Sequence, residues 1–203
     1  QRSRQGIRHE DRGNDDTQNM IEPTGMVVDP AANEVFVSDG ELLFHRRVIV
    51  FDADSGKFKR MWGAYGNRPE DLKDLPRYKP GDPPPQQFRG PHCMRMDKDG
   101  LLYVCDRFND RVQVFRKDGT FVREKFIAPT TLFPGSVYDI AFSPDPAQTY
   151  AYVTDGMNKK VWILLRETLE IVGRFGVGGY SGGQFNHPHS IGIDSKGNLY
   201  VTE

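Results

Sequence analysis

Short apolar runs separated by polar turns recur along this chain, and no segment shows a sustained helical period of apolar residues. In four places an apolar run passes an Asp/Gly or Asp/Pro turn and continues into a second run that ends in an acidic residue. These four segments are 25–39, 93–106, 138–155 and 190–203. Their closing acids lie 67, 49 and 48 residues apart. The last two intervals match the period of about 40–50 residues that is typical of a propeller blade.

Two further apolar runs follow each of the first three segments, so that each of these units has four short strands. The third strands are predicted at 48–51, 112–115 and 161–164, and the fourth strands at 58–62, 121–126 and 171–175. Short β-branched and aromatic strands joined by Gly/Asp turns form one antiparallel blade. The sequence therefore predicts an all-β protein, a β-propeller of four-stranded antiparallel blades, with about three and a half blades present.

The chain is interpreted as one partial propeller domain, 1–203, in which residues 1–22 form a linker between blades. Residues 64–87 are predicted to be an inserted surface loop rich in proline, which has no N–H to donate to a β-ladder. The fourth unit stops after its second strand, and an open propeller edge exposes unpaired backbone groups. We therefore expect the chain to be part of a longer protein that contains further blades.

The charge balance narrows the classes of partner. The chain has 27 Lys plus Arg against 28 Asp plus Glu, a formal net charge of −1. Binding nucleic acid mainly through its phosphates requires a basic face, so no nucleic-acid partner is expected, and the pair Arg46-Arg47 is interpreted as solvated surface. No apolar run approaches the roughly 20 residues that span a bilayer, so no transmembrane segment is predicted.

The two cysteines, Cys93 and Cys105, fall on the two strands of one predicted hairpin, with its turn at 97–100. Their spacing places them close to facing positions, so that a cross-strand disulfide and two buried thiols are both open. Facing cysteines in a sheet often form strained bridges, and we favour the reduced, buried state. Two cysteines are too few for a disulfide scaffold and do not indicate the compartment.

Two histidines occupy matching places in two units. His92 and His189 each follow a proline at the start of the first strand. The first strand is the innermost one of a propeller blade, so side chains at its start can point into the central channel. Histidines that converge there from separate blades could bind a metal ion. The alternative is that both line the channel and hydrogen-bond to backbone or water.

The four units resemble NHL repeats, which build six-bladed propellers. The resemblance rests on a linker pattern that occurs twice. It is Phe175-Gly176 and Gly182-Gly183-Gln184-Phe185 leading to Pro188-His189, and it recurs in part as Gln87-Phe88 and Pro91-His92. It extends over nearly the whole chain. It implies a ring of six blades, of which the remaining ones lie outside this chain.

The arrangement is also similar to the peptidyl-α-hydroxyglycine α-amidating lyase family, propellers that cleave a hydroxyglycine-extended peptide into peptide amide and glyoxylate. That family begins alternate blades with Pro-His, and three such histidines hold zinc. His92 and His189 match two of them, and the third would lie upstream of this chain. By the same match Arg107 would be the channel arginine that helps to hold substrate. The resembling bacterial proteins are often exported, which implies a periplasmic or secreted setting.

One loop departs from that family. Where the family has a catalytic tyrosine after its Ser-Asp-Gly stretch, this chain has Glu41-Leu42-Leu43-Phe44-His45. Either Glu41 or His45 could serve as a base, since both accept protons near neutral pH in a suitable environment. The family's calcium site has an acid directly after its last histidine, whereas this chain has Ser190.

The sequence leads to two functional hypotheses. We favour a protein- or peptide-binding or assembly module without standard lyase activity, because the expected acid/base residue is absent. The insert 64–87 and the loop 41–45 would then form the contact surface. The alternative is a zinc-dependent lyase-like enzyme that uses His92 and His189 as ligands and Arg107 for the anionic end of the substrate.

Overall fold

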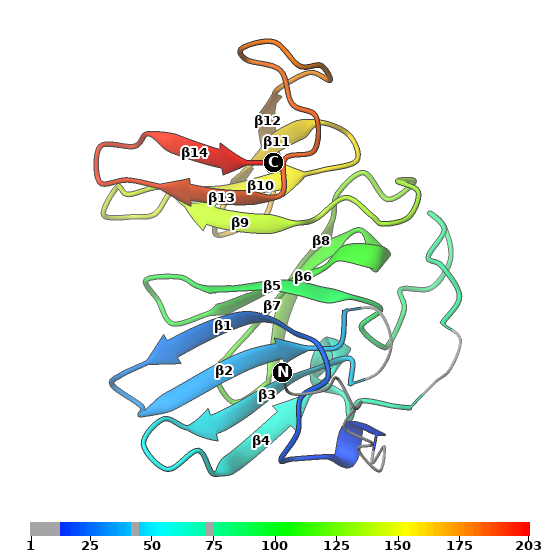
Figure 1. Cartoon of the computed structure of the whole chain (residues 1–203), viewed down its shortest axis with the longest axis vertical. Helices are drawn as coiled ribbons and strands as arrows, with labels where there is room; N and C mark the ends of the chain where they lie inside the picture. The colour runs from blue at the N-terminus through cyan, green and yellow to red at the C-terminus, as the bar shows by residue number, and fades with distance from the viewer. Residues whose placement is uncertain (1–12, 42–44, 72–74) are drawn as a thin grey trace, which may run out of the picture.

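The computed structural model describes residues 13–41, 45–71 and 75–203, and it consists of antiparallel sheets arranged one after another (Figure 1). Three sheets have four strands and the fourth has two, in agreement with the predicted all-β fold of about three and a half blades. Blade 1 consists of β1 (Pro23–Asp29), β2 (Glu34–Asp39), β3 (Arg47–Asp52) and β4 (Phe58–Trp62). Blade 2 consists of β5 (Pro91–Met96), β6 (Leu102–Asp106), β7 (Arg111–Phe115) and β8 (Phe121–Phe126).

The second half of the chain continues the same order. Blade 3 consists of β9 (Asp139–Phe142), β10 (Tyr150–Asp155), β11 (Lys160–Leu165) and β12 (Ile171–Phe175), and blade 4 of β13 (Ser190–Ile193) and β14 (Leu199–Thr202). Among the described residues there are three short 3-10 turns: η1 (Gly13–Asp15) precedes β1, η2 (Ala64–Gly66) follows β4, and η3 (Arg107–Asn109) lies between β6 and β7. The first strands β1, β5, β9 and β13 contact one another in that order, so they form the inner edge of the fan of blades.

The blades pack face to face through the apolar side chains of their strands. Phe36, Trp62 and Met94 belong to the buried cluster between blades 1 and 2. A second cluster joins blades 2 and 3, and a smaller one, with Val161 and Ile191, joins blades 3 and 4. Apolar burial stabilises by roughly 25 cal/mol per Å². These contacts between sheets therefore provide the stability that a single exposed blade lacks.

In blades 1, 2 and 4 the acid that closes the second strand holds the linker that leads into that blade. The Asp39 carboxylate accepts the backbone N–H groups of Ile21 and Glu22, and the Asp106 carboxylate accepts those of Arg89 and Gly90. Glu203 does the same for Asn186 and His187. In these three blades the repeated acid therefore fixes where the chain enters the first strand, whereas Asp155 of blade 3 accepts hydrogen bonds from Asn158 and Trp162.

An arginine inside the sheet completes this arrangement in the first two blades. Arg47 donates to Asp39 and to the carbonyl oxygens of Asn14, Asp16 and Asn19, and its side chain is fully buried. The prediction that Arg46-Arg47 is solvated surface is thus wrong, because a carboxylate and three carbonyls replace the water around the Arg47 guanidinium.

The two cysteines form a disulfide, so the preference for buried thiols is also wrong. Cys93 on β5 lies directly opposite Cys105 on β6, and their sulfurs are bonded. The facing register was predicted from the spacing, and the oxidised state was not. Both side chains are buried between blades 2 and 3.

Two predicted connecting segments are only partly described. Residues 1–12 of the linker lie outside the described residues, and its remainder contains η1 and ends at β1. In the insert, positions 72–74 lie outside the described residues, and the rest of 64–87 contains η2 and no strand. Within the described ranges, no helix is long and apolar enough to cross a membrane.

Candidate functional site

His92 and His189 lie beside each other at the inner edge of the blades. His92 is in β5, and His189 directly precedes β13. Their ring centroids are 4.9 Å apart, and the ring of Tyr138, which directly precedes β9, lies 5.6 Å from His92 and 5.3 Å from His189. The closing acids Asp106 and Glu203 fix the linkers in front of the two histidines. The repeat itself thus brings the histidines together.

Hydrogen bonding sets the orientation of the His92 ring. Its Nδ1 lies 2.8 Å from the carbonyl oxygen of Tyr138. A carbonyl only accepts, so Nδ1 carries the proton and Nε2 presents a lone pair. Burial and the nearby Arg107 guanidinium lower the pKa of His92 from 6.5 to about 4, which keeps the ring neutral at physiological pH. Nε2 lies 3.5 Å from Oε1 of Glu41.

Arg107 comes from η3 and forms an ion pair with Glu41, which lies in the turn between β2 and β3. Its guanidinium carbon lies 4.8 Å from the centroids of both the Tyr138 and the Phe108 rings. Burial lowers the pKa of Arg107, and the Glu41 carboxylate opposes that effect. The arginine is thus held between an aromatic pair and a carboxylate of its own chain.

A cavity of about 250 Å³ lies at the inner edge of β1, β5, β9 and β13, and Arg107 is not among the residues that line it. Its walls include Glu41, His92, Tyr138 and His189, as well as Arg95, which pairs with Asp139 at 2.8 Å. Of the two bases considered for the variant loop, Glu41 reaches this cavity. His45 instead lies in the buried cluster of Asp39 and Arg47 and does not line the cavity. Residues 42–44 of that loop lie outside the described residues.

Sequence reasoning missed Tyr138 and His187 as parts of this site. Tyr138 is 1% exposed, and its hydroxyl has no hydrogen-bond partner among the residues that the structure describes. Its ring stands perpendicular to that of His187, with centroids 5.0 Å apart. Burial raises the pKa of Tyr138. His187 could have been noticed from the sequence His187-Pro188-His189, which places a second histidine in the same linker, whereas no local motif marks Tyr138.

A zinc site would use the imidazole nitrogens of this cavity. Zinc-binding histidines usually donate their second ring N–H to a carbonyl or carboxylate, as His92 does to Tyr138. The His92 ring is therefore oriented as the imidazole of a zinc ligand would be, and the His189 ring lies beside it. Among the described residues, no group of three or more His, Cys, Asp or Glu side chains is already arranged to hold a metal ion.

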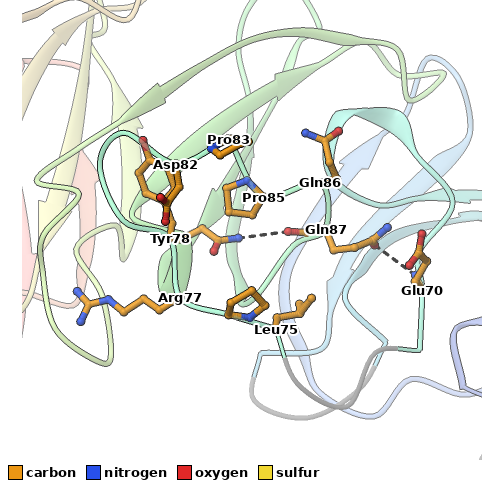
Figure 2. Close-up of a pocket in the computed structure, with 11 residues that line it drawn as sticks. Glu70, Leu75, Arg77, Tyr78, Asp82, Pro83, Pro85, Gln86 and Gln87 are labelled. Atoms are coloured by element: carbon orange, nitrogen blue, oxygen red, sulfur yellow. Dashed lines mark hydrogen bonds between the residues drawn. The ribbon is translucent and has the colours of Figure 1, made fainter.

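A second cavity, of about 420 Å³, lies within the proline-rich insert (Figure 2). Its walls are formed by both limbs of the insert and by η3, through Glu70, Leu75, Pro76, Arg77, Tyr78, Asp82, Pro83, Pro85, Gln86, Gln87 and Asn109. Tyr78 stacks on Phe126 of β8 with ring centroids 4.3 Å apart. The Gln87 carbonyl accepts Asn109 Nδ2 at 3.2 Å, and the Gln87 side chain accepts the Glu70 N–H. The insert is thus tied to blade 2.

Comparison with known proteins agrees with this fold and with the predicted resemblance. Residues 88–115 match the NHL repeat family. The chain is 30% identical over 193 residues to peptidyl-glycine alpha-amidating monooxygenase B of Xenopus laevis, a match that includes 92% of this chain and 20% of that protein. The chain thus contains an NHL repeat, resembles the amidating enzymes, and spans about a fifth of the length of this curated relative.

Solved structures support the propeller fold alone, because their sequence identities are low. Virginiamycin B lyase from Staphylococcus aureus has a TM-score of 0.59 and 16% identity, over 92% of this chain and 50% of that one. Hydrazine synthase from Kuenenia stuttgartiensis has a TM-score of 0.60 and 18% identity, over 90% of this chain and 42% of that one.

Proposed function

We propose that this chain is a protein- or peptide-binding module of an NHL-type propeller, and that it lacks the standard activity of the α-hydroxyglycine lyases. The observation that carries the second part is the ion pair between Glu41 and Arg107. Glu41 stands where the resembling family has its catalytic tyrosine, and it neutralises the arginine that would bind the anionic end of a substrate. A peptide carboxylate would have to displace a carboxylate that is already tethered to the chain.

Peptide or protein binding is supported by the cavity of the insert. Its volume of about 420 Å³ falls within the range of small-ligand pockets, and its walls combine three prolines, a leucine and a tyrosine with six polar or charged residues. A rigid blade that carries a structured loop is a common way to build a recognition surface. We therefore assign the contact surface to the insert, with Tyr78 at its centre.

The test is to select peptides from a displayed random library on the folded protein and to titrate them against variants. Tyr78→Ala removes the ring that stacks on Phe126 and should weaken the selected peptides at least tenfold. Glu170→Gln, at an exposed position outside the insert cavity, is the matched control and should change nothing. Circular dichroism verifies that both variants fold. Failure to select any peptide, or equal affinity for folded Tyr78→Ala, would contradict the proposal.

The second candidate is a zinc-dependent lyase-like enzyme, favoured by the adjacent rings of His92 and His189 and by the similarity to the amidating enzymes. Zinc at these histidines would supply a Lewis acid that polarises a substrate oxygen. His92 would be oriented by the Tyr138 carbonyl, and Arg107 would bind the carboxylate after Glu41 moves away. Glyoxylate release from a hydroxyglycine-extended peptide, abolished by His92→Ala, would establish this activity and refute our first proposal.

We also propose a periplasmic or secreted setting. The Cys93–Cys105 disulfide supports it, because disulfides persist in oxidising compartments and are rare in reducing ones. Trapping free thiols with an alkylating reagent in intact cells, followed by mass spectrometry, tests the proposal. Full alkylation of both cysteines in the natural host would contradict it.

A further inference from the structure

The side-chain amides that line the insert cavity all donate to acceptors of the chain itself. Asn109 Nδ2 donates to the Gln87 carbonyl oxygen, a bond drawn in Figure 2, and to the Asp106 carboxylate. The side-chain nitrogens of Gln86 and Gln87 each donate to a backbone carbonyl. An amide has a donor end and an acceptor end. The acceptor oxygen is therefore the end left for a ligand, most clearly in Asn109, whose nitrogen makes two bonds.

The oxygen of Asn109 lacks a donor. Asn109 is 1% exposed, and its Oδ1 has no hydrogen-bond partner among the described residues. Turning the amide over would not help, because it would place oxygen against the Gln87 carbonyl and the Asp106 carboxylate. A buried acceptor without a donor costs free energy. Asn109 is part of the cavity wall, so a ligand that brings an N–H group to this wall would satisfy the oxygen.

Two carboxylates add negative charge to the same cavity. Glu70 and Asp82 are exposed residues of its wall, and neither forms an ion pair with any residue that the structure describes. Arg77 also belongs to the wall, but in Figure 2 its guanidinium points away from the other labelled side chains. Burial and the Arg77 charge lower the pKa of Arg89, which does not line the cavity. Unpaired carboxylates beside an unpartnered acceptor favour a cation that carries N–H groups.

The remaining wall of the cavity is apolar and aromatic. It consists of Leu75, Tyr78 and three prolines. The Tyr78 ring packs on Phe126, with centroids 4.3 Å apart, so its position does not depend on a ligand. Arginine and lysine have an apolar stem that packs on such surfaces and a charged head with N–H donors, and these heads are attracted to aromatic faces. A basic side chain therefore matches both the apolar and the acidic part of the wall.

We propose that the insert cavity binds an arginine or lysine side chain of a peptide partner. This inference rests on the proposed peptide-binding function and names the class of residue that the insert recognises. The stem of the basic residue lies along Leu75 and Tyr78. Its head donates to Asn109 Oδ1 and pairs with the carboxylates of Glu70 and Asp82. The cavity at the inner edge of the blades has no part in this contact, since the two cavities share no lining residue.

The test measures fluorescence anisotropy at low salt with four labelled peptide pools. The pools have the same random uncharged flanks and carry arginine, lysine, citrulline or norleucine at the centre. Citrulline keeps N–H donors without the charge, and norleucine keeps only an apolar stem. The arginine and lysine pools should bind at least tenfold more tightly than the norleucine pool, with citrulline between them. The double variant Glu70→Gln, Asp82→Asn should reduce the affinity of the arginine pool to that of the citrulline pool.

Glu170→Gln is the control and should keep all differences between the pools, and circular dichroism verifies the fold of each variant. Equal binding of the norleucine and arginine pools would overturn the inference, as would an unchanged preference for arginine over citrulline in the double variant. If Tyr78→Ala still weakens every pool in that case, the insert binds peptides without selecting basic residues, and the proposed function stands. If no pool binds, the inference and the proposed function both fail.

Discussion

Blades 1 and 2 have the same internal construction and carry different side chains on it. In each, a fully buried aspartate closes the second strand and pairs with an arginine at the start of the third, Asp39 with Arg47 and Asp106 with Arg111. The turn between that aspartate and arginine provides Glu41 in blade 1 and Arg107 in blade 2, and these two pair with each other. The repeat thus places equivalent turns close enough for one to neutralise the other.

Blades 1 and 2 also differ in a pair of facing residues on their first and second strands. Gly25 lies opposite Ser38 in blade 1, and the equivalent pair in blade 2 is Cys93 and Cys105. A side chain at Gly25 would clash with the backbone of β5, since a Cβ there would lie 2.7 Å from the Met94 nitrogen. A residue without a side chain is therefore required at position 25, and of these two blades only blade 2 has a covalent link at the equivalent place. Blades 1 and 2 thus share the same backbone arrangement and differ in the side chains that it carries.

The largest effect should come from removing the buried aspartates. Breaking a buried ion pair by truncating one partner costs about 3–5 kcal/mol, because the remaining charge is left without compensation. Asp39→Ala and Asp106→Ala should therefore each lower the free energy of unfolding by about that amount, as measured by urea denaturation. The exposed control Glu170→Ala should change it by less than about 0.5 kcal/mol. A large loss for one aspartate only would show that the two blades are not built alike.

Next in size is the disulfide, which blade 1 lacks. It closes a loop with a sequence separation of 12 residues, and bridges of this kind stabilise by about 2–4 kcal/mol. The Cys93→Ala, Cys105→Ala double variant should lose about that much stability in the absence of reductant. Reductant should lower the unfolding midpoint of the wild type and leave that of the double variant unchanged. Equal midpoints for wild type and variant would mean that the bridge does not contribute.

The sequence predicted the fold because the signals for it are local. Strands such as 112–115 and turns such as 97–100 are each encoded by a few consecutive residues. Because the same pattern recurs in every unit, a wrong prediction for one strand does not change the predicted fold. The facing of Cys93 and Cys105 also follows from one hairpin. The burial of Arg47 could not be predicted, because its partners Asn14 and Asn19 come from a linker far away in sequence.

The candidate site likewise contains some residues that the sequence could predict and others that it could not. His92 and His189 could be selected because a repeated Pro-His phrase marks them. The pairing of Glu41 with Arg107 depends on how two blades stack, and nothing near either residue encodes it. Tyr138 likewise enters the site through packing between rings, which no motif records.

The third effect is a pH dependence of stability that we expect from Asp110. This residue precedes the buried arginine of blade 2, and Arg46 has the equivalent place in blade 1. Burial raises the pKa of Asp110 from 3.8 to about 7. The folded chain therefore binds more protons at this group than the unfolded chain between about pH 4 and 7, so its contribution to stability is present below that window and lost as the pH rises through it.

Asp110→Asn should remove this loss. One pKa unit corresponds to about 1.4 kcal/mol, so a shift from 3.8 to about 7 sets an upper limit of about 4 kcal/mol, and we expect a gain of about 1–4 kcal/mol at pH 8. Asparagine also tolerates the positive φ of 55° at this position. Unfolding midpoints at pH 5 and pH 8 measure the gain. A variant that is no more stable than the wild type at pH 8 would show that Asp110 ionises without penalty.

The smallest effect concerns the contact that joins the two turns. Side chains of Arg107 and Glu41 are 9% and 22% exposed, so their pair is neither fully solvated nor fully buried. A double-mutant cycle with Glu41→Gln and Arg107→Gln should give a coupling free energy of about 1 kcal/mol, between the values of surface and buried pairs. Zero coupling would mean that the turns of blades 1 and 2 act independently, and that Arg107 is free to bind an external anion.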